Sequence, residues 1–242
     1  MTCAMPPIFV ISLKDSAARR AGLLDRLDGM GLQATVFDAV DGRAGLPERY
    51  HSKIDRAGCR ERIFREPSDA EFACALSHNT LYEQIAAGAD RYAIILEDDA
   101  ILTDRFRDVV AALETLDLDL LLLDHQKTFA STESILVADG ITARRVMLSP
   151  ELTTGYAISR RMAAHMATAT LPIRGTADWP LEIENHRTFA TIPRVVDHPE
   201  DEAVSQIQSS RGETVATGRW RRLLRAGYWR KKYRKARYER IA

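Results

Sequence analysis

The chain has 242 residues, 45% of them hydrophobic, and its 34 Lys and Arg equal its 34 Asp and Glu in number. This size and apolar content predict one globular unit with a sizeable core, and no apolar run approaches the roughly 20 residues that a membrane-spanning helix needs. Three cysteines at unrelated spacings, with no secretory leader, predict neither disulfides nor a zinc site built on thiolates, and so indicate a reducing, cytoplasmic compartment.

The first half of the chain alternates short apolar segments with helical patterns. Residues 7–13 (PIFVISL) and 33–40 predict strands, and the segment between them predicts a helix. A polar, irregular stretch at 44–68 predicts a surface excursion. Helical spacing then runs from about 69 to 87, until Gly88 ends it.

The same alternation continues with a strand at 92–99 (YAIILEDD), a helix from 103 to about 116 and an apolar strand at 117–124 (DLDLLLLD). A strand without polar positions is typical of a parallel sheet buried on both faces. We therefore expect an α/β fold, a Rossmann-type α/β/α sandwich with a mostly parallel central sheet. The second half is less regular, with a strand-to-helix pattern at 153–169 followed by loops around short elements.

Three adjacent carboxylates, Glu97, Asp98 and Asp99, end the apolar strand. Adjacent acids repel one another, so they need either full solvation or a cation. In an extended strand Glu97 and Asp99 would share one side, unless the chain has already turned. Mg²⁺ and Mn²⁺ take carboxylates together with phosphate oxygens, and ligands of α/β folds gather at the carboxyl ends of strands. The pattern thus indicates a cation bound with a nucleotide diphosphate, although solvated acids that cap the next helix remain an alternative.

Two other folds that bind phosphates fit the pattern less well. A response-regulator receiver domain also has an acidic cluster and an apolar strand ending in Asp, as the strand at 117–124 does here with Asp124. In a receiver domain, however, the acid pair follows the first strand. A dinucleotide-binding fold would need G-x-G-x-x-G after the first strand, and residues 7–13 are not followed by it.

Five segments in this order resemble glycosyltransferase family 25, the lipooligosaccharide biosynthesis galactosyltransferase type. The resemblance spans about Pro7 to His165, and Ala70, Ala73 and Ser12 depart from the residues commoner in the family. The segments are FVISLKDSAARR, FDAVDGR, EFACALSHNTLYEQI, AIILEDDAIL and TTGYAISRRMA.

The resemblance implies a GT-A-like fold that transfers galactose or glucose from a UDP-sugar donor to a saccharide acceptor in lipopolysaccharide or cell-surface glycan assembly, with inversion. It also implies a Mn²⁺ or Mg²⁺ cofactor at the acidic motif, held by Asp99 first and Glu97 second, which stabilises the departing diphosphate. The alternative is a non-catalytic, carbohydrate-binding or adhesion-type relative of the same fold.

Inversion requires a base opposite the diphosphate, and the candidates lie in the segment ADWPLEIENH. Asp178 is the first candidate and Glu182 the second, with Glu184 close by. An Asp before Trp and Pro in a loop is often only a helix cap, which is the alternative interpretation of Asp178. His198 is a possible third metal ligand, because imidazole also suits Mn²⁺, or else an ordinary loop histidine.

The remaining donor-binding candidates follow the motifs of the family. Arg19 and Arg20 suit the diphosphate, since a guanidinium can pair with its oxygens, although they could equally be solvated helix residues. His78 alone would be interpreted as a core histidine, but the family pattern makes it line the site. The full set is Ser12, Leu13, Arg19, Arg20, Asp41, Ser77, His78, Glu97 and Asp98.

The C-terminal end differs in charge from the rest. Residues 219–242 hold eleven Lys or Arg and one acid, interleaved with Trp and Tyr. Such a segment suits an anionic membrane surface better than nucleic acid, and no nucleic-acid partner is expected. We therefore predict a glycosyltransferase domain at 1–212 and a basic aromatic tail at 213–242 that binds peripherally to the cytoplasmic face of the inner membrane, near a lipid-linked saccharide acceptor.

Overall fold

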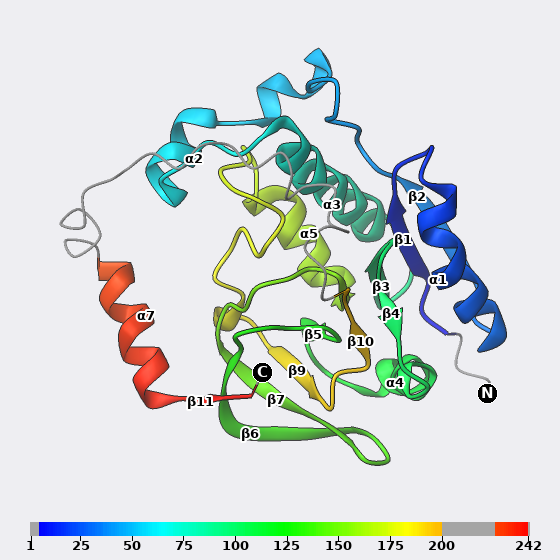
Figure 1. Cartoon of the computed structure of the whole chain (residues 1–242). Helices are drawn as coiled ribbons and strands as arrows, with labels where there is room; N and C mark the ends of the chain where they lie inside the picture. The colour runs from blue at the N-terminus through cyan, green and yellow to red at the C-terminus, as the bar shows by residue number, and fades with distance from the viewer. Residues whose placement is uncertain (1–4, 200–225, 242) are drawn as a thin grey trace.

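The computed structural model describes residues 5–199 and 226–241, and its centre is a nine-stranded sheet (Figure 1). The strands lie in the order β11, β6, β7, β9, β5, β8, β3, β1, β2. They are β1 Ile8–Ser12, β2 Ala34–Asp38, β3 Tyr92–Glu97, β5 Leu120–Leu122, β6 Phe129–Ala138, β7 Ile141–Leu148, β8 Gly155–Ser159, β9 Thr188–Ile192 and β11 Glu239–Arg240. A second, two-stranded ladder pairs β4, Ile101–Leu102, with β10, Val196–Asp197.

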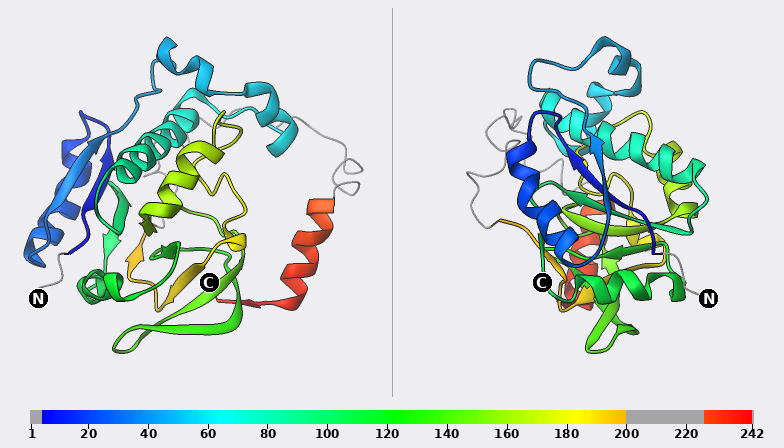
Figure 2. Two further views of the ribbon diagram at one scale, coloured as in Figure 1. Left: turned by 180° about the vertical axis from the view of Figure 1, so that it is seen from behind. Right: turned by 90° about the vertical axis from the view of Figure 1, so that its right-hand side faces the viewer.

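Helices cover both faces of the sheet, and the predicted α/β class is confirmed (Figure 2). One face packs against α1, Ala17–Gly29, and α4, Phe106–Ala112; the other packs against α3, Asp69–Ala87, and α5, Arg160–Ala169. Alternate side chains of β3 enter the two apolar layers, so every residue from Tyr92 to Leu96 is buried. This explains why the strand has no polar position before its acids.

Strand directions decide where polar strand ends meet. The pairings of β1 with β2 and β3, and of β5 with β9, are parallel, whereas β8 is antiparallel to both β3 and β5. Six of the nine strands, namely β1, β2, β3, β5, β6 and β9, consequently run the same way, although most neighbouring pairs are antiparallel. The carboxyl ends of these strands share one edge of the sheet with the start of β8.

Helix α3 forms where the sequence predicts it. Ser68 accepts a hydrogen bond from the Glu71 backbone N–H, and the Glu71 carboxylate accepts one from the Ser68 N–H, which completes a capping box. Gly88 follows the last turn. The polar stretch before α3 contains a 3₁₀ helix, η1 Glu48–Lys53, and a short helix, α2 Arg56–Ile63.

The end of the predicted tail packs against the domain. β11 pairs with β6, and α7, Ala226–Arg237, lies beside the 3₁₀ helix η3, Ile183–Asn185. Arg234 forms an ion pair with Glu184, and Arg230 pairs with Glu182 just before η3. The predicted division at residue 212 lies outside the described residues. Within the described ranges, no helix has the length and apolar character needed to cross a membrane.

Candidate functional site

A pocket opens at the carboxyl edge of β1, β2 and β3, against the first half of α3. Eight of the residues predicted to bind the donor or the metal line it: Ser12, Leu13, Arg19, Asp41, Ser77, Glu97, Asp98 and Asp99. They come from five separate segments of the chain, and the parallel strand ends bring them together. The structure therefore brings eight of the predicted residues together in one pocket, and their roles stay predictions.

The acidic motif has turned out of the strand before it reaches the pocket. β3 ends at Glu97, and the Ala100 N–H donates to the Glu97 carbonyl oxygen across a tight turn. Asp98 and Asp99 consequently share one partner, Arg19, whose Nε lies 2.7 Å from Asp98 Oδ1 and whose Nη2 bonds Asp99. The extended arrangement, with Glu97 and Asp99 on one side, is not the one adopted.

Asp99 has a raised pKa. Burial and the nearby charge of Glu97 raise its pKa from 3.8 to about 6, although the Arg19 guanidinium acts in the opposite direction. Its Oδ1 is buried without a hydrogen-bond partner. An acid with a raised pKa and an unsatisfied buried oxygen is a natural position for a bound cation.

Glu97 faces a different set of groups. Thr153 Oγ1 donates to Glu97 Oε1 at 2.7 Å, and His78 Nε2 lies 3.5 Å from the same oxygen. Burial acts to raise the pKa of Glu97, but His78 and Thr153 outweigh burial, so the pKa lies below its ordinary value. Glu97 is thus ionised at neutral pH.

Polar side chains hold the walls of the pocket in place. Ser12 Oγ donates to Asp98 Oδ2 at 2.8 Å, and Arg20 donates to Ser12 Oγ and to the Leu13 carbonyl oxygen. Ser77 Oγ accepts from the Val40 N–H at 2.8 Å and so fastens the segment after β2 to α3. Arg20 therefore supports the end of β1, and it does not line the pocket.

The turn after β2 approaches α3 very closely. A Cβ atom on Gly42 would lie 2.3 Å from the Asp69 backbone oxygen, so only glycine fits this contact. Beyond it, Arg43 donates to Asp41 and Asp15 at the rim of the pocket. Hydrogen bonds from Arg43 are the main reason that the pKa of Asp41 lies below its ordinary value.

The two predicted bases occupy different environments. Asp178 is exposed. Burial is the main reason that the pKa of the Cys74 thiol is raised, and the charge of Asp178 adds to that rise, which places Asp178 within electrostatic reach of this pocket residue. Glu182 is half exposed and paired with Arg230 of α7, away from the pocket lining. Glu184 is buried and bonded to Ser149 and Arg234. Of these acids, Asp178 suits a role at the pocket best.

His198 follows β10 on the same edge of the sheet, but its nearest partner is Asp124. His198 Nδ1 lies 2.8 Å from Asp124 Oδ2, and Arg194 contacts the other oxygen at 3.3 Å. Burial raises the pKa of Asp124 even though both neighbours act to lower it. Within the described ranges, His198 does not join Glu97 and Asp99 in a three-ligand cluster. Its role as a metal ligand stays a prediction.

Three pocket residues were missed by sequence reasoning. Cys74, Arg43 and Thr153 all contact predicted site residues or line the pocket themselves. Cys74 stands four residues before His78, a spacing that puts both on one face of a helix, and that spacing was the available signal. Thr153 lies two residues before β8, and the sequence did not reveal that β8 runs antiparallel to β3.

Comparisons with known proteins identify the family of the chain. The model of the family described as "Glycosyltransferase family 25 (LPS biosynthesis protein)" matches residues 5–181. "Probable inactive glycosyltransferase 25 family member 3" of Rattus norvegicus is 29% identical over 161 residues, which cover 63% of this chain and 28% of that protein. "Inactive glycosyltransferase 25 family member 3" of Mus musculus is 33% identical over 118 residues, covering 48% of this chain and 19% of that protein.

A third relative carries no such qualification in its name. "Glycosyltransferase 25 family member" of Anopheles gambiae is 28% identical over 103 residues, covering 41% of this chain and 17% of that protein. The chain thus spans less than a third of the length of these curated relatives. The family model nevertheless covers most of the chain and every segment that forms the pocket. The chain belongs to glycosyltransferase family 25.

Proposed function

We propose that the chain transfers galactose or glucose from a UDP-sugar to a hydroxyl group of a saccharide acceptor, with inversion, in the assembly of lipopolysaccharide or another cell-surface glycan. The observation that carries the proposal is the convergence of Glu97, Asp98, Asp99 and Arg19 in one pocket at the carboxyl ends of parallel strands. Nucleotide ligands of α/β folds bind at that edge.

A divalent cation, Mn²⁺ or Mg²⁺, fits the donor set of this pocket. The ligands would be oxygens of Asp99 and Glu97, and the buried, unpaired Oδ1 of Asp99 supports that assignment. Such an ion supplies Lewis-acid stabilisation of the charge on the departing diphosphate. Arg19 is placed to pair with a diphosphate oxygen once it exchanges one of its two carboxylate partners.

The acceptor hydroxyl needs a base, and we assign that role to Asp178. Trp179 next to it is buried and packs edge-on against Tyr156, with ring centroids 5.1 Å apart, so the loop is anchored against β8. The exposed carboxylate of Asp178 can accept the proton as the hydroxyl attacks the sugar carbon.

Thermal unfolding with UDP, with and without Mn²⁺, tests the site. A ligand at 100 times its Kd adds about 2.7 kcal/mol to the stability of the folded state, or about 5–10 °C for a chain of this size. We expect this shift only when UDP and Mn²⁺ are present together, and we expect Asp99→Ala to abolish it. Asp104→Ala, which changes an acid whose side chain is 89% exposed in the next turn, is the matched control. A shift that survives in Asp99→Ala would refute the assignment.

A screen of UDP-sugars for Mn²⁺-dependent hydrolysis tests the donor and the activity. UDP-galactose and UDP-glucose are expected to react, and Asp178→Asn should lower transfer to an acceptor by about 10²–10⁴-fold with UDP binding unchanged. Equal transfer by Asp178→Asn and the unmodified chain would remove the base assignment while leaving the donor site standing.

A non-catalytic, carbohydrate-binding relative is the second candidate. Arg19 already pairs with two of the three acids and offsets one of their charges, which reduces the need for a metal ion, and two relatives are named inactive. The candidates differ in one result. A non-catalytic protein would bind a saccharide but hydrolyse no UDP-sugar with Mn²⁺ present.

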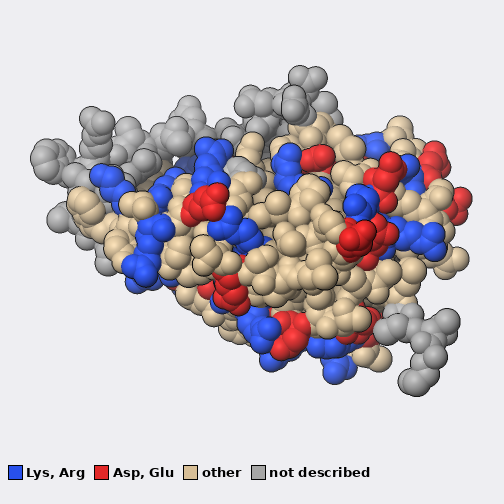
Figure 3. All heavy atoms as spheres, turned by 90° about the horizontal axis from the view of Figure 1, so that it is seen from below, with Lys and Arg blue, Asp and Glu red and all other residues tan. Residues whose placement is uncertain are grey.

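We also propose that the chain works at the cytoplasmic face of a membrane carrying a lipid-linked saccharide acceptor. On α7, Trp229 and Tyr233 are 53% and 61% exposed, one helical turn apart, and basic side chains gather at the α7 end of the face shown in Figure 3. Acidic and basic side chains mix over the rest of that face. Anionic lipids attract such a surface.

The tail is best tested by substitution. Deleting residues 219–242 would also remove β11 and the arginine partner of buried Glu184. We expect Trp229→Ala with Tyr233→Ala to weaken binding to anionic vesicles without changing transfer to a soluble acceptor. Leu136→Ala, which alters a 70% exposed residue of β6, is the control. Equal vesicle binding by both variants would rule out the α7 surface.

A further inference from the structure

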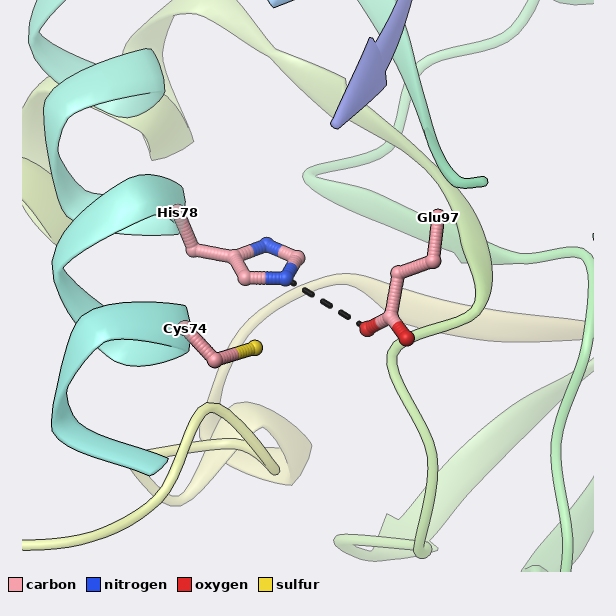
Figure 4. A group of neighbouring side chains, drawn as sticks. All are labelled: Cys74, His78 and Glu97. Atoms are coloured by element: carbon pink, nitrogen blue, oxygen red, sulfur yellow. Dashed lines mark ion pairs between the residues drawn. The ribbon is translucent and has the colours of Figure 1, made fainter. Parts of the chain in front are cut away.

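A cluster of three potential metal ligands lies on the inner side of the pocket. Cys74 and His78 are one turn apart on α3, and both point toward Glu97 at the end of β3 (Figure 4). One ligand atom from each residue lies within 4.8 Å of the other two. Among residues 5–199 and 226–241, no other group of three His, Cys, Asp or Glu side chains meets this criterion.

His78 is oriented as metal-binding histidines are. It is 2% exposed, and its Nδ1 lies 2.8 Å from the hydroxyl of Tyr156, which in turn contacts the hydroxyl of Tyr82 at 2.8 Å. These contacts fix the ring and leave Nε2 buried and aimed at Glu97, whose Oε1 lies 3.5 Å away, too far for a good hydrogen bond. A metal ion between the two atoms would satisfy this nitrogen more fully.

The other two ligands are reachable and partly preorganised. Cys74 and Glu97 line the pocket, so an ion and a water ligand can enter from solvent. Thr153 Oγ1 donates to Glu97 Oε1 and restricts the carboxylate. Zinc bonds of about 2.0–2.3 Å put tetrahedral ligands about 3.3–3.8 Å apart, so the cluster needs only a small contraction.

We propose that Cys74, His78 and Glu97 bind a zinc ion, at a site that shares only Glu97 with the Mn²⁺ or Mg²⁺ ion proposed at Asp99. Sulfur and nitrogen ligands select Zn²⁺ or Co²⁺ over the hard cations that prefer oxygen. The thiol proton leaves when the ion binds, because only the thiolate is a ligand. Burial raises the pKa of Cys74, which makes the site one of moderate affinity.

Zinc at this position would act against donor binding. Zinc takes Glu97 as a ligand. The cation at Asp99 then loses Glu97 and is held by fewer protein oxygens. The ion also narrows the pocket where α3 forms its wall. Zinc is therefore expected to inhibit the Mn²⁺-dependent response to UDP, and Cys74→Ser is expected to relieve that inhibition.

Co²⁺ reports the site directly, because a thiolate bonded to Co²⁺ gives a charge-transfer band in the near ultraviolet. The full chain is first freed of bound metal with a chelator. It is then titrated with Co²⁺ to detect the band, and with Zn²⁺ in competition with a chromophoric chelator to measure the Zn²⁺ affinity. We expect the band in the unmodified chain and not in Cys74→Ser. We also expect Zn²⁺ affinity to fall by about tenfold or more in Cys74→Ser and in His78→Gln. Cys59→Ser changes a fully buried cysteine elsewhere and is the control.

Two outcomes overturn the proposal. One is the absence of a thiolate band in the unmodified chain, and the other is an equal Zn²⁺ affinity in Cys74→Ser. Circular dichroism identifies a variant that fails to fold. If His78→Gln fails to fold, the test rests on Cys74→Ser, which is a near-isosteric change. The thermal response to UDP and Mn²⁺ is measured on the unmodified chain without Zn²⁺, so either result leaves the proposed function to its own experiment.

Discussion

Replacing Asp99 with Asn should stabilise the metal-free protein. Asp99 is a carboxyl group whose ionised form is disfavoured by burial and by Glu97, and Asn has no charge to bury. The same substitution removes a ligand oxygen from the proposed cation site. Asp99→Asn is therefore expected to gain stability and to lose the response to Mn²⁺ and UDP, which is the signature of an acid retained for function.

The size of the gain follows from the pKa. A rise from 3.8 to about 6 means that ionised Asp99 costs the folded state about 3 kcal/mol above pH 7. That cost is already net of Arg19, whose guanidinium acts to lower the same pKa. The expected gain is therefore about 3 kcal/mol, or about 6–12 °C in Tm.

The pH dependence is the sharper test, because its sign is fixed. Because its pKa is raised, the contribution of Asp99 to stability is most favourable below the unfolded value of 3.8 and is lost as the pH rises through about 6. The gain of Asp99→Asn should be near zero at pH 4 and complete at pH 7.5. Urea denaturation with EDTA at several pH values measures it, and Asp104→Asn is the control. A gain that does not change with pH would refute the electrostatic account.

Three further predictions concern the frame around the site. Gly42→Ala should lower the free energy of unfolding by about 1–3 kcal/mol, because its Cβ would clash with the backbone at the start of α3. Gly22→Ala, on the open surface of α1, is the control and should not destabilise the chain. Urea unfolding midpoints measure both variants. Arg234→Ala should cost about 3 kcal/mol by the same measurement, since it leaves the 4% exposed side chain of Glu184 without its cation. Burial lowers the pKa of His125, so stability should fall as the pH drops below about 6.5, and His125→Gln should flatten that slope.

The parts of the fold that sequence predicts are those with local signals. Helix α3 has its capping box and a terminal glycine, and β3 has an unbroken apolar run. The β6 to β7 hairpin has only a weaker signal, Asp139 and Gly140 at its turn, where Gly140 has a φ of +67°. The hairpin went unpredicted because its strands mix apolar and polar residues without strict alternation, as half-exposed strands near a sheet edge do.

The site was predictable by residue type and not by contact. Motif order identified the acids and Arg19, but the pairing of Arg19 with residues 80 positions away depends on β1 and β3 being neighbours. The antiparallel insertion of β8 between β3 and β5 brings Thr153 to Glu97, and no local pattern encodes that direction. The tail shows the same limit, since its composition suggests a membrane surface while its arginines form ion pairs with Glu182 and Glu184.

The charges at the pocket explain why a diphosphate would need a cation there. The lining contains two arginines and four carboxylates, Arg19 and Arg43 against Asp41, Glu97, Asp98 and Asp99, so it is negative by two when all are ionised. Arg43 is already paired with Asp41 at the rim, and Arg19 is shared between two acids. A diphosphate entering this pocket alone would be repelled. One divalent ion at Asp99 cancels this excess negative charge. The proposed function therefore requires UDP and Mn²⁺ to bind together. Tight binding of UDP by the metal-free chain would contradict the proposed function.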